Sequence, residues 1–358
     1  MNKRKKILIC PLDWGLGHAT RCIPIINSLL KKNIEIIIAA DGQSQSLLKQ
    51  EFPKLEHITF EGYNVTYPKK GNMISHFIGQ VPKLASQVKA ENKQLQELIQ
   101  KHNIDGVISD NRYGLYSSSV PCIFITHQVM VKAPLFEKPI HRLIKGFCEK
   151  YTNVWVPDFE GTPNLSGDLA HKYILPNGEF IGPLSRFENL SFSKHVNYKY
   201  DLMVIISGPE DQRTVFENCI LDQLQQYHIK AIVLRGLPGR SEVKHFNTFS
   251  VFPHLETKIF LNEMAQAKLV ICRSGYSTIM DLYTLGKNAV FIPTPGQTEQ
   301  EYLAKYYERE EMFYAVDQDK LDLKEIEEKS KYYSGWKSIN HSNQQLLEGA
   351  IEKFIAKI

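Results

Sequence analysis

Short apolar runs alternate with longer amphipathic stretches along almost the whole chain. Residues 34–40 are apolar at nearly every position, as expected of a strand that is buried on both faces of a sheet. Similar runs predict further strands at residues 6–10, 57–62, 106–110, 122–127, 153–157, 201–207, 229–235, 269–272 and 288–294. The stretches between them predict helices at residues 19–30, 75–102, 140–151, 211–227, 277–285, 299–308 and 344–357. This alternation is typical of βαβ units and therefore of parallel sheets.

Residues 184–200 interrupt the alternation with a polar stretch of no clear period, which follows the turn pair Gly182-Pro183 and is typical of a linker. We therefore expect an α/β protein made of two Rossmann-like, doubly wound domains with an interdomain cleft. The predicted domains are residues 1–183 and 201–335. Residues 336–358 are expected to form a C-terminal helix, for which packing on the N-terminal domain is one arrangement.

The length and the charge agree with this organisation. At about 150 residues per domain, 358 residues predict two domains. The net charge is +4, and the run Lys3-Arg4-Lys5-Lys6 alone supplies four positive charges. The rest of the chain is therefore almost neutral. Nucleic acid is therefore not expected as a partner, since it usually requires a clustered basic face. The basic run is interpreted as a solvated tail, with peripheral contact at a membrane surface as the alternative.

The sequence also favours a cytoplasmic protein. No apolar stretch approaches the roughly 18 residues that span a bilayer. The apolar run at residues 7–10 is too short for the core of a signal peptide. The six cysteines contain no CxxC pair, and we interpret them as reduced thiols.

The loop after the first strand carries Gly15, Gly17 and His18. In open α/β sheets ligands bind beyond the carboxyl ends of the strands, where glycine lets a backbone approach them closely. The loop is similar to a dinucleotide-binding fingerprint, but Thr20 replaces its third glycine, which argues against NAD or FAD.

His18 and Asp110 are the candidate catalytic pair. An imidazole at the start of a helix can accept a proton from a hydroxyl near neutral pH. Asp110 closes the strand at residues 106–110 and should lie at the same sheet edge, where its carboxylate can orient the imidazole. From the residues alone, an ordinary helix-start histidine and a turn-initiating aspartate remain the alternatives.

Three strand-to-helix loops in the second half carry residues suited to a nucleotide-sugar. Small residues followed by arginine suit an anionic diphosphate, and Asp281, one turn into a helix, can accept hydrogen bonds from ribose hydroxyls. For each loop considered alone, the alternative is that it only connects a strand to a helix and caps that helix. The polar and small residues concerned are Ser207, Gly208, Arg213, Arg273, Ser274, Gly275, Ser277, Thr278, Gln297, Gln300 and Glu301.

Residues 260–304 resemble the C-terminal domain of GT-B glycosyltransferases, in particular the family of the lipid-linked peptidoglycan N-acetylglucosaminyltransferase. The resemblance implies that Arg273-Ser274-Gly275 meets the diphosphate, that Asp281 holds the ribose, and that Gln300-Glu301 contacts the donor sugar. It further implies that the segment containing Phe260, Leu261 and Met264 meets the uracil.

The first loop resembles the N-terminal signature of the same superfamily, through Gly15-x-Gly17-His18 and Arg21. In the plant-type members a first-loop histidine is activated by an aspartate that closes a later strand, which implies that role for His18 and Asp110. The residues expected on the acceptor side are Arg21, Thr126, His127 and Gln128.

Together these features predict an inverting glycosyltransferase that moves a hexose or N-acetylhexosamine from a UDP-sugar to a hydroxyl acceptor, with a lipid-linked or envelope glycan as one acceptor class. The N-terminal domain would bind the acceptor and the C-terminal domain the nucleotide-sugar. No cofactor or metal is expected, because Arg213, Arg273 and loop N–H groups would stabilise the leaving diphosphate. We interpret Asp317-Gln318-Asp319 as a solvated turn rather than a metal site. The alternatives are a nucleotide-sugar 2-epimerase and a non-catalytic nucleotide-sugar-binding protein.

Overall fold

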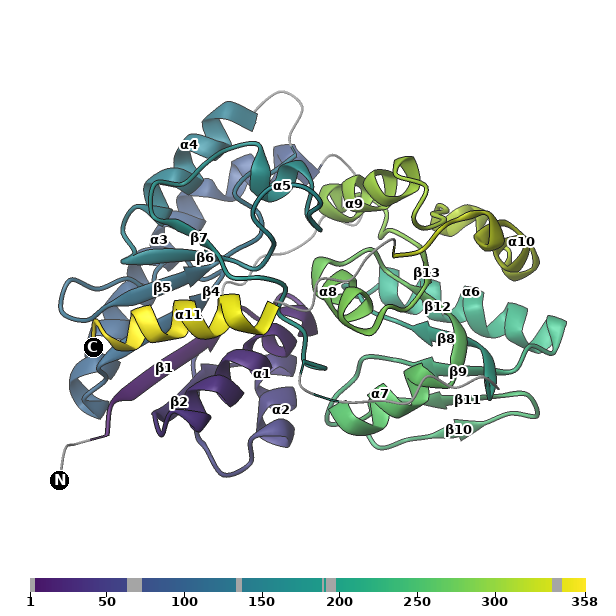
Figure 1. Ribbon diagram of the computed structural model, residues 1–358, viewed down its shortest axis with the longest axis horizontal. Coiled ribbons are helices and arrows are strands. Elements are labelled where there is room, and N and C mark those ends of the chain that lie inside the picture. The colour runs from purple at the N-terminus through teal and green to yellow at the C-terminus, as the bar shows by residue number, and fades with distance from the viewer. Residues whose placement is uncertain (1–3, 63–72, 133–136, 189, 191–197, 337–342) are drawn as a thin grey trace. The chain divides into compact units, whose positions relative to one another are not determined.

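A computed structural model describes residues 4–62, 73–132, 137–188, 190, 198–336 and 343–358 of the chain (Figure 1). Residues 191–197 of the predicted linker, and residues 337–342 of the predicted C-terminal helix, lie outside the described residues. The chain divides into two compact units. The first comprises Met1–Trp14, His18–Leu184 and His341–Ile358, and the second comprises Gly15–Gly17 and Ser185–Asn340.

The first unit is built on a sheet in which every neighbouring pair of strands is parallel, with the order β3-β2-β1-β4-β5-β6-β7. The register pairs Pro11 of β1 with Asp110 of β4, so these two strands end side by side. Residues that follow β1 therefore lie at the same sheet edge as Asp110. The strands are β1 (Lys6–Pro11), β2 (Glu35–Ala40), β3 (Glu56–Thr59), β4 (Gly106–Asp110), β5 (Cys122–Ile125), β6 (Asn153–Val156) and β7 (Gly178–Phe180).

Helices cover this sheet and bury the alternating apolar side chains of its strands. Leu8 and Cys10 of β1 belong to a buried cluster that includes Leu95 of α3 and Ile144 of α4. The C-terminal helix also belongs to this unit, because Phe354 of α11 packs edge-on against Trp155 of β6, with 6.0 Å between the ring centres. The helices are α1 (Leu16–Lys31), α2 (Gly42–Glu51), α3 (Met73–His102), α4 (Glu137–Cys148), α5 (Asp168–His171) and α11 (Asn343–Ile355).

The second unit has a sheet of order β10-β11-β9-β8-β12-β13, parallel except for the antiparallel pair β10 and β11. Cys272 of β12 pairs with Ile205 of β8 and with Phe291 of β13, so the loops after these strands meet at one edge. The strands are β8 (Tyr200–Ile205), β9 (Ala231–Leu234), β10 (Lys244–His245), β11 (Phe249–Phe252), β12 (Ala267–Cys272) and β13 (Ala289–Phe291). The helices are α6 (Gln212–Tyr227), α7 (Thr257–Ala265), α8 (Tyr276–Leu285), α9 (Thr298–Arg309) and α10 (Leu323–Lys329), with single 3₁₀ turns η1 (Gln318–Lys320) and η2 (Ser330–Tyr332).

The predicted fold class, α/β with two Rossmann-like parallel sheets, is confirmed. The elements absent from the prediction are short or polar, namely α2, α5, α7, α10, β7, β10 and β11. Among the described residues, no helix combines the length and the apolarity that crossing a membrane requires.

Candidate active site

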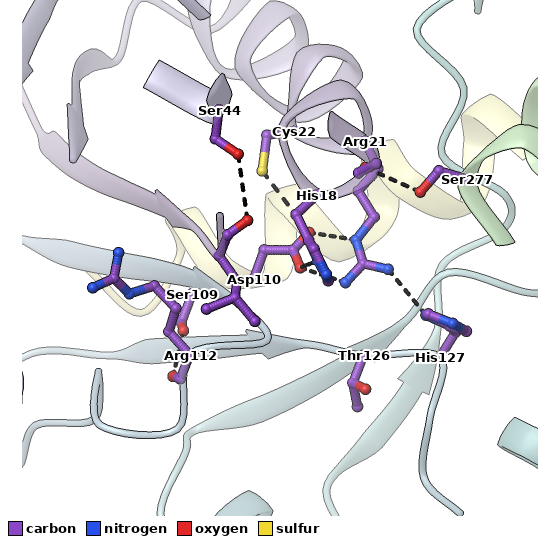
Figure 2. Close-up of polar contacts among 12 residues, drawn as sticks. His18, Arg21, Cys22, Ser44, Ser109, Asp110, Arg112, Thr126, His127 and Ser277 are labelled. Atoms are coloured by element: carbon purple, nitrogen blue, oxygen red, sulfur yellow. Dashed lines mark hydrogen bonds and ion pairs between the residues drawn. The ribbon is translucent and has the colours of Figure 1, made fainter. Parts of the chain in front are cut away.

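His18 and Asp110 meet at the carboxyl edge of the first sheet (Figure 2). His18 lies in the first turn of α1 and Asp110 is the last residue of β4. Their Nδ1 and Oδ1 atoms are 2.7 Å apart. The Asp110 side chain is fully buried, whereas that of His18 keeps 15% of its surface exposed. The carboxylate therefore orients an imidazole that solvent can still reach.

Arg21, which the sequence analysis placed on the acceptor side, is the second residue that Asp110 binds. Its Nε donates to Oδ2 of Asp110 and its Nη2 to Oδ1, in a two-point ion pair, and its side chain is only 1% exposed. The third nitrogen, Nη1, lies 3.0 Å from Nδ1 of His127. His18 and Arg21 stand three residues apart on α1 and so share a helix face, a spacing that could have indicated their common partner.

The charge state of Asp110 follows from these contacts. Burial raises the pKa of the carboxyl, but the nearby Arg21 and His18 outweigh burial and leave it below its ordinary value. Asp110 is therefore an anion at neutral pH and accepts hydrogen bonds without donating any.

Thr126, His127 and Gln128 follow β5, whose last residue, Ile125, pairs with Asp110 in the sheet. Thr126 is buried, and its Oγ1 accepts a hydrogen bond of 3.1 Å from the N–H of Gln128. Thr126 therefore shapes the turn that carries the other two side chains. His127 is 7% exposed and Gln128 is half-buried.

In the second unit, the loops after β12 and β13 are tied together by the start of α9. Ser274 Oγ donates to the carbonyl of Gln300 at 2.7 Å, and Gln300 Oε1 accepts from the N–H of Thr294 at 2.8 Å. Glu301 Oε1 accepts from the N–H of Gly296 at 2.8 Å. Of the candidate donor residues here, Gly275 caps α8, Ser277 and Thr278 are half-buried in its first turn, and Gln297 caps α9.

Asp281 of α8 is engaged by two residues of the segment that enters this unit. Ser185 Oγ donates to Oδ1 of Asp281 at 2.7 Å, and Nε of Arg186 lies 3.4 Å from Oδ2. Burial raises the pKa of the Asp281 carboxyl, against the opposing effect of Arg186. Each oxygen of Asp281 therefore has one partner within the protein, and its predicted contact with a ribose stays a prediction.

Arg186 links this carboxylate to the predicted uracil segment. Its guanidinium lies over the ring of Phe260, 4.2 Å from the centre, and over that of Phe187, at 4.9 Å. The side chains of Phe260, Leu261 and Met264 are buried on α7. Sequence reasoning missed Ser185 and Arg186 because both fell within the predicted linker.

Comparison with known proteins places the chain in a family. Residues 216–345 match the model of the glycosyltransferase family 28 C-terminal domain. A Histophilus somni protein named UDP-N-acetylglucosamine–N-acetylmuramyl-(pentapeptide) pyrophosphoryl-undecaprenol N-acetylglucosamine transferase is 35% identical over 91% of this chain and 88% of its own length. The chain belongs to glycosyltransferase family 28. A Campylobacter jejuni protein of the same name is 22% identical over 86% of this chain and 84% of its own.

Solved structures support the fold of this family 28 glycosyltransferase. The crystal structure of Acinetobacter baumannii MurG matches with a TM-score of 0.54 and 13% sequence identity, over 96% of this chain and 92% of that one. The two Rossmann-like sheets are thus those of the GT-B fold, and the chain is an enzyme that transfers a glycosyl group.

In this family 28 chain Arg273, the first predicted diphosphate contact, is enclosed by its own protein neighbours. It is 1% exposed, and its five N–H groups point to main-chain carbonyls and one side-chain amide. It lies 4.2 Å above the ring of Phe216, and burial lowers its pKa to about 10, which leaves it charged at neutral pH. Its acceptors are the carbonyls of Ser207, Gln212, Ile292 and Pro293 and Oε1 of Gln318.

Arg213, the second predicted diphosphate contact, is likewise paired within the protein. Its Nε lies 2.6 Å from Glu210 and its Nη1 lies 2.8 Å from Glu217, both on carboxylate oxygens. Arg273 thus joins the loops after β8 and β13, whereas Arg213 joins Glu210 to Glu217 of its own helix α6. Gly208, in the loop they support, has φ +109°, which only glycine adopts readily, and a Cβ there would lie 3.3 Å from Thr294 Oγ1.

Asp317 and Gln318 of the Asp317-Gln318-Asp319 sequence have separate partners. Asp317 pairs with Lys320 at 3.0 Å on the surface, while Gln318 turns inward to Arg273. Within the part of the chain that the structure describes, no cluster of three His, Cys, Asp or Glu side chains is arranged to hold a metal ion.

Proposed function

We propose that this chain is an inverting glycosyltransferase that moves a sugar from a UDP-sugar to an acceptor hydroxyl, without a metal. The first unit would bind the acceptor and the second the donor. The observation that carries the proposal is the His18–Asp110 pair, with Nδ1 and Oδ1 2.7 Å apart, in a chain of family 28. The names of its Histophilus and Campylobacter relatives specify UDP-N-acetylglucosamine and a pyrophosphoryl-undecaprenol substrate, which supports a UDP-sugar donor and favours a lipid-linked acceptor.

His18 supplies the base in this reaction. Asp110 accepts a hydrogen bond from Nδ1–H of His18, so the lone pair is on Nε2, which takes the proton from the acceptor hydroxyl. The hydroxyl oxygen forms a bond to the anomeric carbon on the face opposite the diphosphate. The bond from that carbon to the phosphate oxygen breaks, and its electron pair leaves with UDP. A single displacement of this kind inverts the anomeric configuration.

In this proposal, main-chain N–H groups stabilise the negative charge of the leaving diphosphate. Arg273 and Arg213 are engaged by carbonyls and carboxylates, respectively. The first turn of α8 follows the small residues Ser274 and Gly275, and its N–H groups have no acceptor inside the helix. Such a turn binds anions through these N–H groups and the positive end of the helix dipole.

A thermal-shift series tests the nucleotide, because a ligand that binds only the folded state raises the melting temperature. A UDP-sugar at a hundred times its dissociation constant should stabilise the protein by about 2.7 kcal/mol. GDP- and dTDP-sugars at the same concentration should give smaller shifts. Equal shifts for all three sugars, or none for the UDP-sugar, would contradict a UDP-sugar donor.

Asp281→Asn is expected to weaken UDP binding by about 1–3 kcal/mol, because it removes the charge from hydrogen bonds to the ribose. The matched control is Ser185→Ala, which removes the 2.7 Å hydrogen bond to Asp281 and leaves its carboxylate in place. Calorimetry should show a loss for Asp281→Asn that clearly exceeds the loss for Ser185→Ala. Equal losses would mean that Asp281 acts only by holding the Ser185–Arg186 segment.

Transfer is expected to survive EDTA, because the N–H groups at the start of α8 take the place of a divalent cation. The measurement is the initial rate of UDP release with and without a millimolar excess of chelator. Loss of turnover that magnesium or manganese restores would overturn the metal-independent mechanism.

A further inference from the structure

Arg21 lies between the carboxylate of Asp110 and the imidazole of His127 (Figure 2). Two of its nitrogens donate to the carboxylate of Asp110, and the third, Nη1, lies 3.0 Å from Nδ1 of His127. A guanidinium has five N–H donors and no acceptor. Each partner atom of Arg21 must therefore offer a lone pair, and this requirement determines where the protons of the neighbouring imidazoles lie.

His18 carries its proton on Nδ1. Oδ1 of Asp110 accepts from Arg21 and also lies 2.7 Å from Nδ1 of His18. Since the carboxylate is ionised, it can only accept, and Nδ1 of His18 must donate. In the neutral ring the lone pair then resides on Nε2.

His127 has the opposite arrangement. Its Nδ1 receives an N–H of Arg21, so Nδ1 holds the lone pair and the ring proton is on Nε2. A second proton on this ring would bring a cation against the charged guanidinium at 3.0 Å. Nε2 of His127 is therefore the donor of this ring.

We propose that Arg21 is a positioning residue that gives His18 and His127 opposite tautomers, so that Nε2 of His18 can only accept a proton and Nε2 of His127 can only donate a hydrogen bond. The functional meaning rests on the proposed glycosyl transfer: His127 is excluded as the base and serves as a donor to an oxygen. The charged and titratable groups of this cluster are His18, Arg21 and Cys22 of α1, Asp110 of β4 and His127 after β5, with Cys22 Sγ 4.0 Å from Asp110 Oδ2.

The assignment is tested in the wild-type enzyme by nitrogen-15 NMR of labelled histidine side chains, at about pH 8, above the usual imidazole range. The resonances are assigned by their loss in His18→Ala and His127→Gln. The chain offers two internal standards. His141 Nδ1 lies 3.1 Å from the carbonyl of Val129 and must be protonated there, whereas His57 Nε2 lies 3.0 Å from the carbonyl of Phe52 and must be protonated at that atom.

We expect His18 to show the pattern of His141 and His127 to show that of His57. A protonated Nδ1 on His127, or a protonated Nε2 on His18, would overturn the proposal. Arg21→Leu removes the donor to His127, and should turn its pattern into a mixture of both tautomers while the two standards stay unchanged. An unchanged His127 pattern in a folded Arg21→Leu protein would equally overturn the role of Arg21.

The tautomer assignment and the assignment of His18 as the base can be contradicted independently of each other. If His18→Ala retains turnover while the wild-type spectra show opposite tautomers, the base assignment is wrong and the tautomer assignment stands. If His18→Ala is inactive while His127 is protonated on Nδ1, the proposed reaction stands and Arg21 does not set the tautomers. The wild-type spectra decide this without any variant that depends on correct folding of a buried substitution.

Discussion

His18→Ala should lower the rate of sugar transfer by about 10²–10⁴-fold, the usual effect of losing a general base. The dissociation constant for UDP should stay near the wild-type value, because the proposed donor residues all belong to the second unit. Folding should also persist, since His18 is partly exposed and its loss leaves Asp110 paired with Arg21. Steady-state kinetics and calorimetry on the same preparation measure both effects.

The chain contains a matched control for this substitution in His171. Its Nε2 lies 3.2 Å from Oδ2 of the buried Asp158, and its side chain is 18% exposed, close to the 15% of His18. Asp158 accepts main-chain N–H groups of its own loop, so this second histidine–aspartate pair holds a loop together. His171→Ala should therefore keep turnover. Similar turnover in the His18 and His171 variants would remove His18 as the base.

The meeting of His18 and Asp110 could be predicted because it follows from strand order. Parallel strands end at one sheet edge; Asp110 is the last residue of β4, and His18 lies at the start of the helix that follows β1. The ion pair between Arg21 and Asp110 is set by the same geometry, but arginine on a helix is usually solvated. Recognising this pair required the i, i+3 spacing to be considered together with the burial of that face of α1.

The role of Arg273 could not be predicted from the sequence in the same way. Four of its acceptors are main-chain carbonyls, which every residue carries, so no side-chain pattern marks them. Gln318 was considered only as the middle residue of an acidic turn, although its amide faces Arg273. The resemblance to the family indicates the loop, but it does not indicate whether the arginine side chain faces a ligand or the loop's own backbone.

Short elements were missed for a related reason. Helix α7 begins at Thr257 without a side-chain cap and has polar residues on its exposed face, so its sequence shows neither a start signal nor a long period. Strand β7 has three residues, two of them partly buried, and its place is determined by pairing with β6. Tertiary contacts decide such segments more than local preference does.

Asp110→Asn should lower the free energy of unfolding by about 3–5 kcal/mol, because it leaves the buried Arg21 without its counter-charge. An amide side chain can accept from the guanidinium but cannot neutralise it. Transfer should fall as well, because His18 loses the acceptor that orients it. Denaturant titration measures the stability, and hydrogen exchange of the α1 and β4 amides locates the loss in the first unit.

The pH dependence of stability gives this substitution a second signature. The pKa of Asp110 is lowered in the folded protein, so its ion pair stabilises the fold above the carboxyl's unfolded value and loses that effect as the pH falls through the folded one. The wild-type stability should therefore decline in acid, below about pH 4, more steeply than that of Asp110→Asn. Parallel curves would mean that Asp110 contributes no such effect.

The double variant Asp110→Asn with Arg21→Gln decides whether the two residues act as one unit. Replacing both charges removes the buried, uncompensated guanidinium that the single substitution leaves. The free energy of unfolding of the double variant should therefore be larger than that of Asp110→Asn alone. Losses that simply add, within about 0.5 kcal/mol, would mean that the pair is not coupled. Coupling is expected because both oxygens of Asp110 accept from Arg21 and both side chains are buried.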